Sequence, residues 1–265
     1  MIHSFRVYFL YFVQFFKARL SYRLDFITGL VASLFSAVGG IVFIFLLLNG
    51  DTVTSLKGWS REQVLFIYGY SLISTSLFGL VSVNLYRFSD KYIVEGQFDR
   101  VLLRPLNSLF QVLFESFNLE SVGGFLLGVG VIVFAAAKAH IVFTPLDILW
   151  LMVTAVSGSV ILIAVFAAVA SMSFHFEDRL GLVPPVYNLV MFSRYPLPIF
   201  NRFIQIFLSW VIPFAFVSFY PATHFFEPEK QEFLGYFSPI VALCCCGVTA
   251  LLWRLGVGKY ASTGS

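Results

Sequence analysis

Long stretches without a charged side chain run through this sequence, and they limit the folds that the chain can adopt. Residues 26–48 carry no charge, and neither do residues 63–86. A membrane-spanning helix needs about 20 predominantly apolar residues, because the bilayer interior is about 30 Å thick and a helix rises about 1.5 Å per residue. Charged residues make up only 12% of the chain, whereas a typical soluble domain carries about 25%. We therefore expect a membrane protein.

Apolar runs of sufficient length predict an all-α membrane protein with six transmembrane helices, in a single domain that covers residues 1–265. Another apolar stretch, residues 180–199, is interrupted by four prolines, and the sequence leaves open whether it enters the membrane. The six predicted spans are residues 26–48, 63–86, 119–137, 148–174, 203–222 and 236–253.

Residues 1–25 combine an aromatic stripe at helical spacing with basic residues that follow it. This pattern indicates a helix that lies along the lipid headgroups; a short additional span is the alternative. No small-residue cleavage site follows the apolar part, so we expect a retained segment rather than a signal peptide. The stripe consists of Phe5, Phe9, Phe12 and Phe16.

Basic residues are distributed unevenly between the two sides that six spans define. With the N-terminus inside, thirteen of the seventeen lysines and arginines fall on inner segments and four on outer segments. Cytoplasmic loops are enriched in such residues. The distribution predicts a multi-pass protein of a bacterial-type cytoplasmic (inner) membrane, with both termini in the cytoplasm. The four outer residues are Lys57, Arg61, Lys138 and Lys230.

Seven charged side chains are concentrated in residues 87–105, RFSDKYIVEGQFDRVLLRP. The predicted orientation places this segment in the cytoplasm. Gly96 permits a bend, and Pro105 ends any helix that follows it. We expect a short surface helix with apolar side chains toward the bilayer, on which Lys91 and Glu95 can form an ion pair. An ordinary solvated loop near lipid phosphates is the alternative.

Three stretches then carry a family resemblance. EGQFDRVLLRPLN, residues 95–107, resembles the signature that follows the second span in ATP-binding-cassette permeases of the type-2 export class, in a branch formerly known as a domain of unknown function. RYPLPIF at 194–200 and IPFAFVSFYPA at 212–222 are similar to further parts of that family. The resemblance covers essentially the whole chain, although Gln97 departs from the small or acidic residue expected there.

The resemblance implies that residues 87–108 form a cytoplasmic coupling segment that docks on a separate nucleotide-binding ATPase subunit of an exporter. The sequence contains no phosphate-binding G-x-x-x-x-G-K-[ST] run. ATP and Mg²⁺ are therefore expected on the partner ATPase, with no cofactor on this chain. The other expected partners are the lipid bilayer and a second permease, identical or homologous, and no nucleic acid. The residues implied in ATPase coupling are Glu95, Gly96, Asp99, Arg100 and Arg104.

Polar side chains recur at roughly helical spacing along residues 63–86 and predict a stripe facing a translocation path or the seam between two permeases. The alternative is that the hydroxyl groups bond to the backbone of their own helix. Pro213 can kink the predicted fifth span, and the resemblance implies a re-entrant segment before the last helix. The candidate path residues are Tyr68, Ser71, Thr75, Ser82, Tyr86 and Pro213.

An intramembrane enzyme acting on a lipid-linked substrate is the alternative function, with Glu115, Glu120 or His175 as its reactive group. Both carboxylates fall near the inner interface, where water reaches them, and this position favours the transport interpretation. The four histidines lie on both sides of the predicted membrane, so we expect no metal site and no catalytic residue.

Small residues within two predicted spans indicate packing. Gly124 and Gly128 form a G-x-x-x-G spacing, which lets two helices approach closely. Residues 244–246 are three consecutive cysteines, which we interpret as small packing residues rather than as a disulfide or a metal site.

Overall fold

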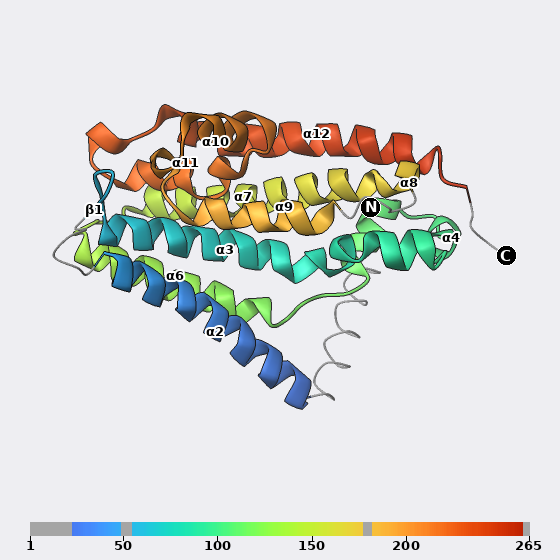
Figure 1. The fold of residues 1–265 in the computed structure, drawn as a ribbon, viewed down its shortest axis with the longest axis horizontal. Coiled ribbons are helices and arrows are strands. Elements are labelled where there is room, and N and C mark those ends of the chain that lie inside the picture. Colours follow the sequence, from blue (N-terminus) through green and yellow to red (C-terminus); the bar gives the residue numbers. More distant parts are fainter. Residues whose placement is uncertain (1–22, 49–54, 177–181, 262–265) are drawn as a thin grey trace.

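The structure is a computed structural model, and it describes residues 23–48, 55–176 and 182–261. Long helices run side by side along the molecule (Figure 1). Within the described ranges, five helices are long and apolar enough to cross a membrane. Five of the six predicted spans therefore correspond to such helices. The five are Phe26–Leu47, Arg61–Val94, Ser121–Lys138, Pro145–Phe176 and Phe233–Val257.

Two helices and a short antiparallel hairpin form the first part of the fold: α2 (Arg23–Leu47), β1 (Ser55–Leu56), β2 (Trp59–Ser60) and α3 (Arg61–Tyr86). A capping box begins α3, because the Ser60 side chain accepts from the Gln63 backbone N–H and the Gln63 side chain accepts from the Ser60 N–H. Apart from the start of α2, the predicted interfacial helix, residues 1–25, lies outside the described residues.

Further helices complete the bundle: α4 (Phe98–Leu102), α5 (Ser108–Phe114), α6 (Ser121–Lys138), α7 (Pro145–Ser171), α8 (Ser173–Phe176) and α12 (Ser238–Val257). A capping box between Thr144 and Asp147, with Pro145 in the first turn, begins α7. Contacts join α3 to α6 and α7, and α7 to α12. The core of the molecule therefore forms around α3 and α7 (Figure 1).

Glycines allow α3 and α6 to pack with their backbones in contact. A Cβ atom on Gly128 would lie 2.9 Å from the Gly69 carbonyl oxygen, and one on Gly69 would lie 3.0 Å from the Gly128 carbonyl oxygen. A Cβ atom on Gly124 would lie 2.6 Å from the Ser76 side-chain oxygen. The packing role predicted from the G-x-x-x-G spacing is confirmed, and its partner helix is α3.

Short helices build the chain between α8 and α12. They are α9 (Val183–Leu189), η2 (Val190–Arg194), η3 (Leu197–Ile199), α10 (Arg202–Ile206), η4 (Phe207–Val211), η5 (Phe214–Val217), α11 (Phe219–Ala222), η6 (Thr223–Phe225), η7 (Pro228–Lys230) and η8 (Phe233–Phe237). Of these short helices, those labelled η are 3₁₀ helices except η4, which is a π-helix.

The predicted fifth span, residues 203–222, is not a helix of membrane length. The helix that begins at Arg202 ends at Val211, where Ile212 is extended with φ −123° and ψ 96°. Pro213 follows and has no N–H to donate, so the chain restarts as η5. By contrast, the proline-interrupted region that the sequence left open forms α9 and η2, which pack against α7 and α3 respectively.

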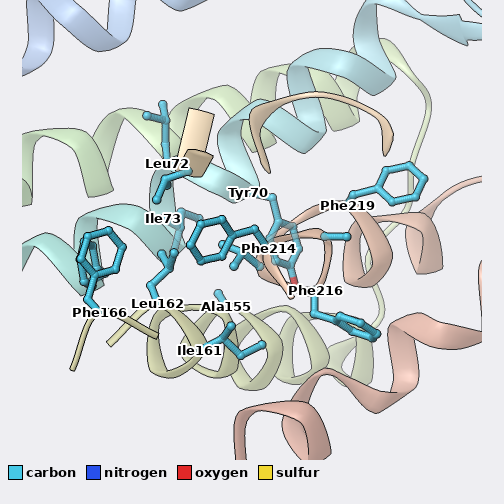
Figure 2. Packing of buried hydrophobic residues seen from close by; sticks show 14 of the residues in the cluster. Tyr70, Leu72, Ile73, Ala155, Ile161, Leu162, Phe166, Phe214, Phe216 and Phe219 are labelled. Atoms are coloured by element: carbon cyan, nitrogen blue, oxygen red, sulfur yellow. The ribbon is translucent and has the colours of Figure 1, made fainter. Parts of the chain in front are cut away.

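Residues from three elements form the centre of the core, where η5 inserts between α3 and α7. Figure 2 shows Phe214 and Phe216 of η5 among side chains of α3 and α7. The Ser74 side chain donates to the Val217 carbonyl oxygen at 3.1 Å. Gly158 lies against the same carbonyl, and a Cβ atom there would come within 2.6 Å of its oxygen. Small residues on α7 thus make room for the inserted segment.

Candidate functional site

A cleft with a volume of about 570 Å³ lies between α2, α3, α6, α7 and the α9–η2 segment, and we call it the cleft. Leu72, Thr75, Gly79, Ser82 and Tyr86 recur at helical spacing and give it one continuous wall on α3. That wall alternates apolar and polar groups, so the cleft can accommodate a molecule with both characters.

Three of the six candidate path residues line the cleft. These are Thr75, Ser82 and Tyr86. The Thr75 hydroxyl also donates to the Ser71 carbonyl oxygen of its own helix at 2.7 Å, which is the alternative that the sequence allowed. Pro213 does not line the cleft; it lies at the break between η4 and η5.

The other two candidate path residues lie on α3 beyond the end of the cleft and hold neighbouring segments. The Tyr68 hydroxyl donates to the Ala37 carbonyl oxygen of α2 at 2.7 Å. The side-chain oxygens of Ser71 and Ser193 are 3.0 Å apart and join α3 to η2. Both α3 side chains are fully buried, so they act in helix packing.

Sequence reasoning missed the two arginines of the cleft, Arg87 and Arg194. Arg87 was grouped with the coupling segment, and Arg194 was counted in an inner loop. One signal was present in the sequence: residues 182–193 are all uncharged, and the charged residue Arg194 follows them directly. Polar residues of α2 and α6 were also missed, because their helices show no polar stripe. They are Ser33, Ser36 and Ser121.

The predicted coupling segment begins where α3 continues beyond the cleft into a π-helix, η1 (Ser89–Val94). Gly96 has a φ of 69°, a left-handed conformation that favours glycine, and the chain turns there into α4. Asn107 then caps α5 by accepting from the backbone N–H groups of Leu109 and Phe110. The predicted bend at Gly96 and the short helix after it are confirmed.

Phe98 anchors α4 in a cluster of aromatic rings. It is fully buried, with ring centroids 4.9 Å from Phe174, 5.0 Å from Tyr260 and 6.0 Å from Phe88. The Trp253 ring of α12 lies 6.4 Å away. The apolar side of α4 was predicted to face the bilayer, and this prediction is wrong for Phe98, because the ends of α3, α8 and α12 cover it.

Glu115 pairs with two of the four basic residues of the predicted coupling segment. Its carboxylate oxygens lie 2.6 Å from an Arg100 nitrogen and 3.5 Å from Lys91 Nζ, and Tyr92 donates its hydroxyl to it. The predicted Lys91–Glu95 pair does not form, because η1 is a π-helix and its five-residue hydrogen-bond spacing displaces residues four apart. Glu115 therefore fixes α4 to the end of α3.

The remaining predicted coupling residues lie on the surface of this turn. Glu95 and Arg104 are exposed, and Glu95 accepts from the Gln97 amide at 2.8 Å. Asp99 lies near the Tyr260 hydroxyl, and burial together with this carboxylate raises the pKa of Tyr260 to about 12. The structure thus brings all five predicted residues together at the turn and α4.

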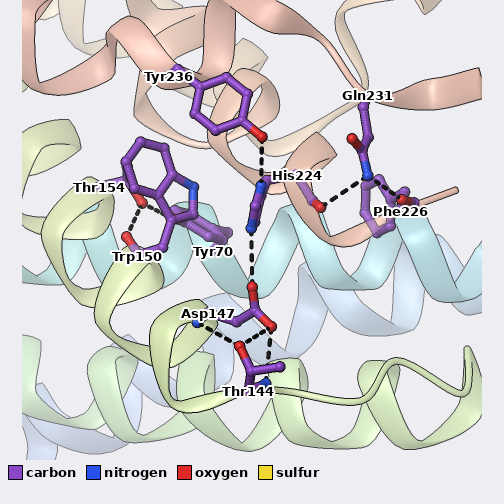
Figure 3. Close-up of polar contacts among 9 residues, drawn as sticks. All are labelled: Tyr70, Thr144, Asp147, Trp150, Thr154, His224, Phe226, Gln231 and Tyr236. Atoms are coloured by element: carbon purple, nitrogen blue, oxygen red, sulfur yellow. Dashed lines mark hydrogen bonds and ion pairs between the residues drawn. The ribbon is translucent and has the colours of Figure 1, made fainter. Parts of the chain in front are cut away.

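A polar network joins helices at the opposite end of α3 (Figure 3). His224 Nε2 lies 3.0 Å from an Asp147 carboxylate oxygen, and His224 Nδ1 lies 3.1 Å from the Tyr236 hydroxyl. Asp147 also accepts from the Thr144 backbone N–H that caps α7. The network ties η6 and η8 to the start of α7.

The residues of the enzymatic alternative do not form a reactive site. Glu115 is engaged in ion pairs, and none of Glu115, Glu120 and His175 lines the cleft. Among residues 23–48, 55–176 and 182–261, no group of three or more His, Cys, Asp or Glu side chains could hold a metal ion. The enzymatic interpretation therefore has no support.

Apolar membrane-capable helices around a cleft with polar and apolar walls indicate an integral multi-pass membrane protein. The chain matches the ABC-2 family transporter proteins over residues 34–264 and belongs to this family. The comparison with curated proteins gave no match, and neither did the comparison with solved structures. The family match confirms the resemblance and the role of a permease domain in an ABC transporter.

Proposed function

We propose that this chain is the permease subunit of an ATP-driven exporter and that the cleft is its part of the translocation path. The observation that carries the proposal is the polar wall of α3, which faces the α9–η2 segment in a chain of the ABC-2 family. Polar side chains are costly within a membrane and mark the paths of substrates and ions. Thr75 and Ser82 are polar groups of this kind.

The fifth span in this proposal consists of α9, η2 and η3 rather than residues 203–222. Near its start, the ring centroids of Tyr187 and Tyr86 are 5.9 Å apart. Near its end, the Pro198 carbonyl oxygen accepts from Lys57 Nζ at 3.0 Å. The seventeen residues from Val183 to Ile199 extend about 26 Å at the rise of an α-helix, close to the thickness of a bilayer interior.

The re-entrant segment comprises two arms, α10–η4 and η5–α11. The ten residues from Arg202 to Val211 extend about 15 Å, which is half of a bilayer interior. The side-chain oxygens of Ser209 and Tyr220 are 2.9 Å apart and join the two arms. The chain after the second arm packs back on it at Gly235 of η8, which lies against the Tyr220 carbonyl just before α12.

This topology keeps both termini in the cytoplasm. It moves Arg202 to the outer side and Arg194 into the cleft, so eleven basic residues remain inside and five lie outside. The positive-inside bias thus has the same direction as in the six-span prediction. Lys57 and the His224 network then lie at the outer end, and α4 at the inner end.

Coupling to ATP hydrolysis occurs at α4, with ATP and Mg²⁺ on a separate ATPase subunit. Contacts of Phe98 reach the ends of α3, α8 and α12, so a displacement of α4 acts on three helices together. Glu115 transmits the same displacement to α5 through its pair with Arg100. Because α3 carries the polar wall, its displacement changes the width of the cleft.

A second permease, identical or homologous, completes the path. In the most apolar 18-residue stretch of α2, only 11% of the residues are buried. The helix exposes large apolar side chains such as Phe35 and Leu46. Such a surface is suited to lipid and to a second permease. The α2 helix borders the cleft, so a partner seated there would close the path on that side.

A charge reversal at an exposed coupling residue tests the proposal. We expect Glu95→Arg to reduce co-purification of the ATPase with the tagged chain from native membranes, together with its ATP turnover. Glu229→Arg is the matched control, because Glu229 is exposed on η7 and should change neither quantity. Unchanged assembly and turnover in Glu95→Arg, Asp99→Ala and Arg100→Ala would contradict the assigned coupling role.

A further inference from the structure

The charge of the cleft is entirely positive. Arg87 and Arg194 line it, and no aspartate, glutamate, lysine or histidine does so among the described residues. Contacts along α3 indicate how far apart the two arginines lie. The residue before Arg194 bonds to Ser71, and Arg87 lies sixteen positions after Ser71, a helical rise of about 24 Å. The arginines therefore mark the two ends of the cleft.

Arg194 lies at a depth where an unpaired charge is unfavourable. Its neighbour bonds to Ser71, ten residues or about 15 Å from the start of α3, so the proposed topology places it well inside the bilayer. No ion pair joins Arg194 to a carboxylate within the described ranges, and its Nε is buried without a hydrogen-bond partner. The Tyr68 ring, 5.9 Å from Arg194 Cζ, is its one aromatic contact of the cation–π kind there.

Hydrogen-bond donors and apolar groups accompany the arginines. Hydroxyl groups of Ser33 and Ser36 on α2, Ser76 on α3 and Ser121 on α6 line the cleft. Apolar side chains such as Phe166 and Met191 form part of the same walls. The combination of cationic and hydroxyl donors with apolar walls matches a molecule that carries an anionic group on an apolar body.

We propose that the cleft binds the anionic group, a phosphate or a carboxylate, of an amphiphilic substrate, with Arg87 at the inner entrance and Arg194 as the deep binding residue. This inference rests on the proposed function, because it assigns a substrate class to the proposed path. An arginine can offer two parallel N–H donors to a phosphate or carboxylate. Binding of the anion would supply the partner that Arg194 Nε lacks.

Native mass spectrometry of the full chain in a neutral detergent tests this inference. The probes are phosphatidylglycerol, phosphatidylcholine of the same acyl chains, and inorganic phosphate. We expect the chain to retain phosphatidylglycerol in preference to phosphatidylcholine, and Arg194→Gln to weaken that preference on the order of tenfold, as loss of a charge-assisted hydrogen bond implies. Arg194→Lys should retain part of the preference, because it keeps the charge.

Arg202→Gln is the matched control, because Arg202 is exposed on α10 and lies outside the cleft. It should leave the preference unchanged, whereas lipids bound merely to the outer surface would respond to both variants alike. If Arg194→Gln does not fold, Arg87→Gln supplies the test at the exposed end of the cleft. We expect it to weaken the preference for phosphatidylglycerol less than Arg194→Gln does. Competition by inorganic phosphate would identify the anionic group alone as the ligand, and its absence would show that the apolar body is needed.

An equal affinity for the two lipids, or a preference that no arginine variant of the cleft alters, would overturn the inference. The measurement uses the isolated chain, so it does not depend on the ATPase. Co-purification of the unsubstituted chain with the ATPase separates the two proposals. An unsubstituted chain that assembles with the ATPase but shows no anion preference would contradict only the substrate class, whereas loss of assembly in Glu95→Arg concerns only the coupling role.

Discussion

The two ends of the helix bundle are held together by similar aromatic clusters but differ in the continuity of their backbone. At the end that the proposed topology places inside, one helix runs from Arg61 to Val94, and Phe98 packs into a cluster at its end. At the proposed outer end, Phe66 contacts Phe225 and Phe226, which lie in or beside the short helix η6. Short 3₁₀ helices have weaker hydrogen-bond geometry than α-helices. The inner end is therefore suited to transmitting a displacement, and the outer end to rearranging.

Truncation of one aromatic ring at each end should have the largest effect and tests most strongly whether the two ends differ. Phe98 and Phe66 are both fully buried, so Phe98→Ala and Phe66→Ala should each lower the free energy of unfolding by about 3–5 kcal/mol. Thermal unfolding in detergent measures this loss, and Leu103→Ala, at an exposed position, is the control. Only Phe98→Ala should also reduce ATP turnover per folded complex. Equal effects of the two variants on turnover would remove the distinction between the ends.

Neutralising Glu115 should weaken the inner end without creating a cavity. Glu115→Gln removes the negative charge that Arg100 and Lys91 share, and we expect a loss of about 1–2 kcal/mol because both partners are partly solvated. Chemical denaturation at low and high salt measures it. Glu227→Gln is the control, since the Glu227 carboxylate is 66% exposed and lies 3.9 Å from Lys230 Nζ. An equally large loss of unfolding free energy in Glu227→Gln would show that Glu115 stabilises the fold no more than an exposed carboxylate does.

The His224 network should affect the outer end locally. His224→Ala removes the contacts of η6 with Asp147 and Tyr236, and we expect a loss of about 0.5–1.5 kcal/mol. Hydrogen exchange of residues 223–236 should become faster, while exchange in α4 stays unchanged. His175→Ala, at an exposed histidine of the inner end, should leave both regions as they are. Faster exchange throughout the molecule would contradict a local role.

The smallest expected effect concerns Tyr260 at alkaline pH. Its pKa is raised to about 12 by burial and the nearby Asp99, from the value of about 10 expected in the unfolded chain. The contribution of this pKa shift to the free energy of unfolding is fully present below pH 10. It is lost as the pH rises toward 12, because the unfolded chain releases the Tyr260 proton first. Tyr260→Phe should therefore flatten part of the loss of stability between pH 10 and 12. A pH-dependent difference in stability between the two chains below pH 9 would contradict the raised pKa of Tyr260 as its cause.

The sequence predicts the long helices well, because an apolar run of about 20 residues has one stable arrangement in a bilayer. It also predicts the bend at Gly96, since a left-handed residue there favours glycine. In the proposed topology the fifth span lies before residues 203–222, and prolines obscure it in the sequence: Pro184 and Pro185 lie in the first turn of α9 and are tolerated there, whereas Pro213 ends a helix.

Parts of the site depend on three-dimensional packing that spacing does not encode. Thr75, Ser82 and Tyr86 were found from their period along one helix, which the structure retains. Arg194 reaches the cleft only because α9 and η2 pack against α3 and α7, and no local pattern specifies that approach. The partners of Lys91 likewise depend on the π-helical geometry of η1 and on the fold that brings Glu115 beside it.

Accessibility of the cleft during ATP turnover tests the central claim most directly. The measurement is the rate at which a membrane-impermeant thiol reagent labels Ser82→Cys in the assembled transporter, after Cys244, Cys245 and Cys246 have each been replaced by alanine. We predict that ATP changes this rate several-fold and that Glu95→Arg abolishes the change. An identical labelling rate with and without ATP, in a complex that hydrolyses ATP, would contradict coupling between the inner segment and the cleft.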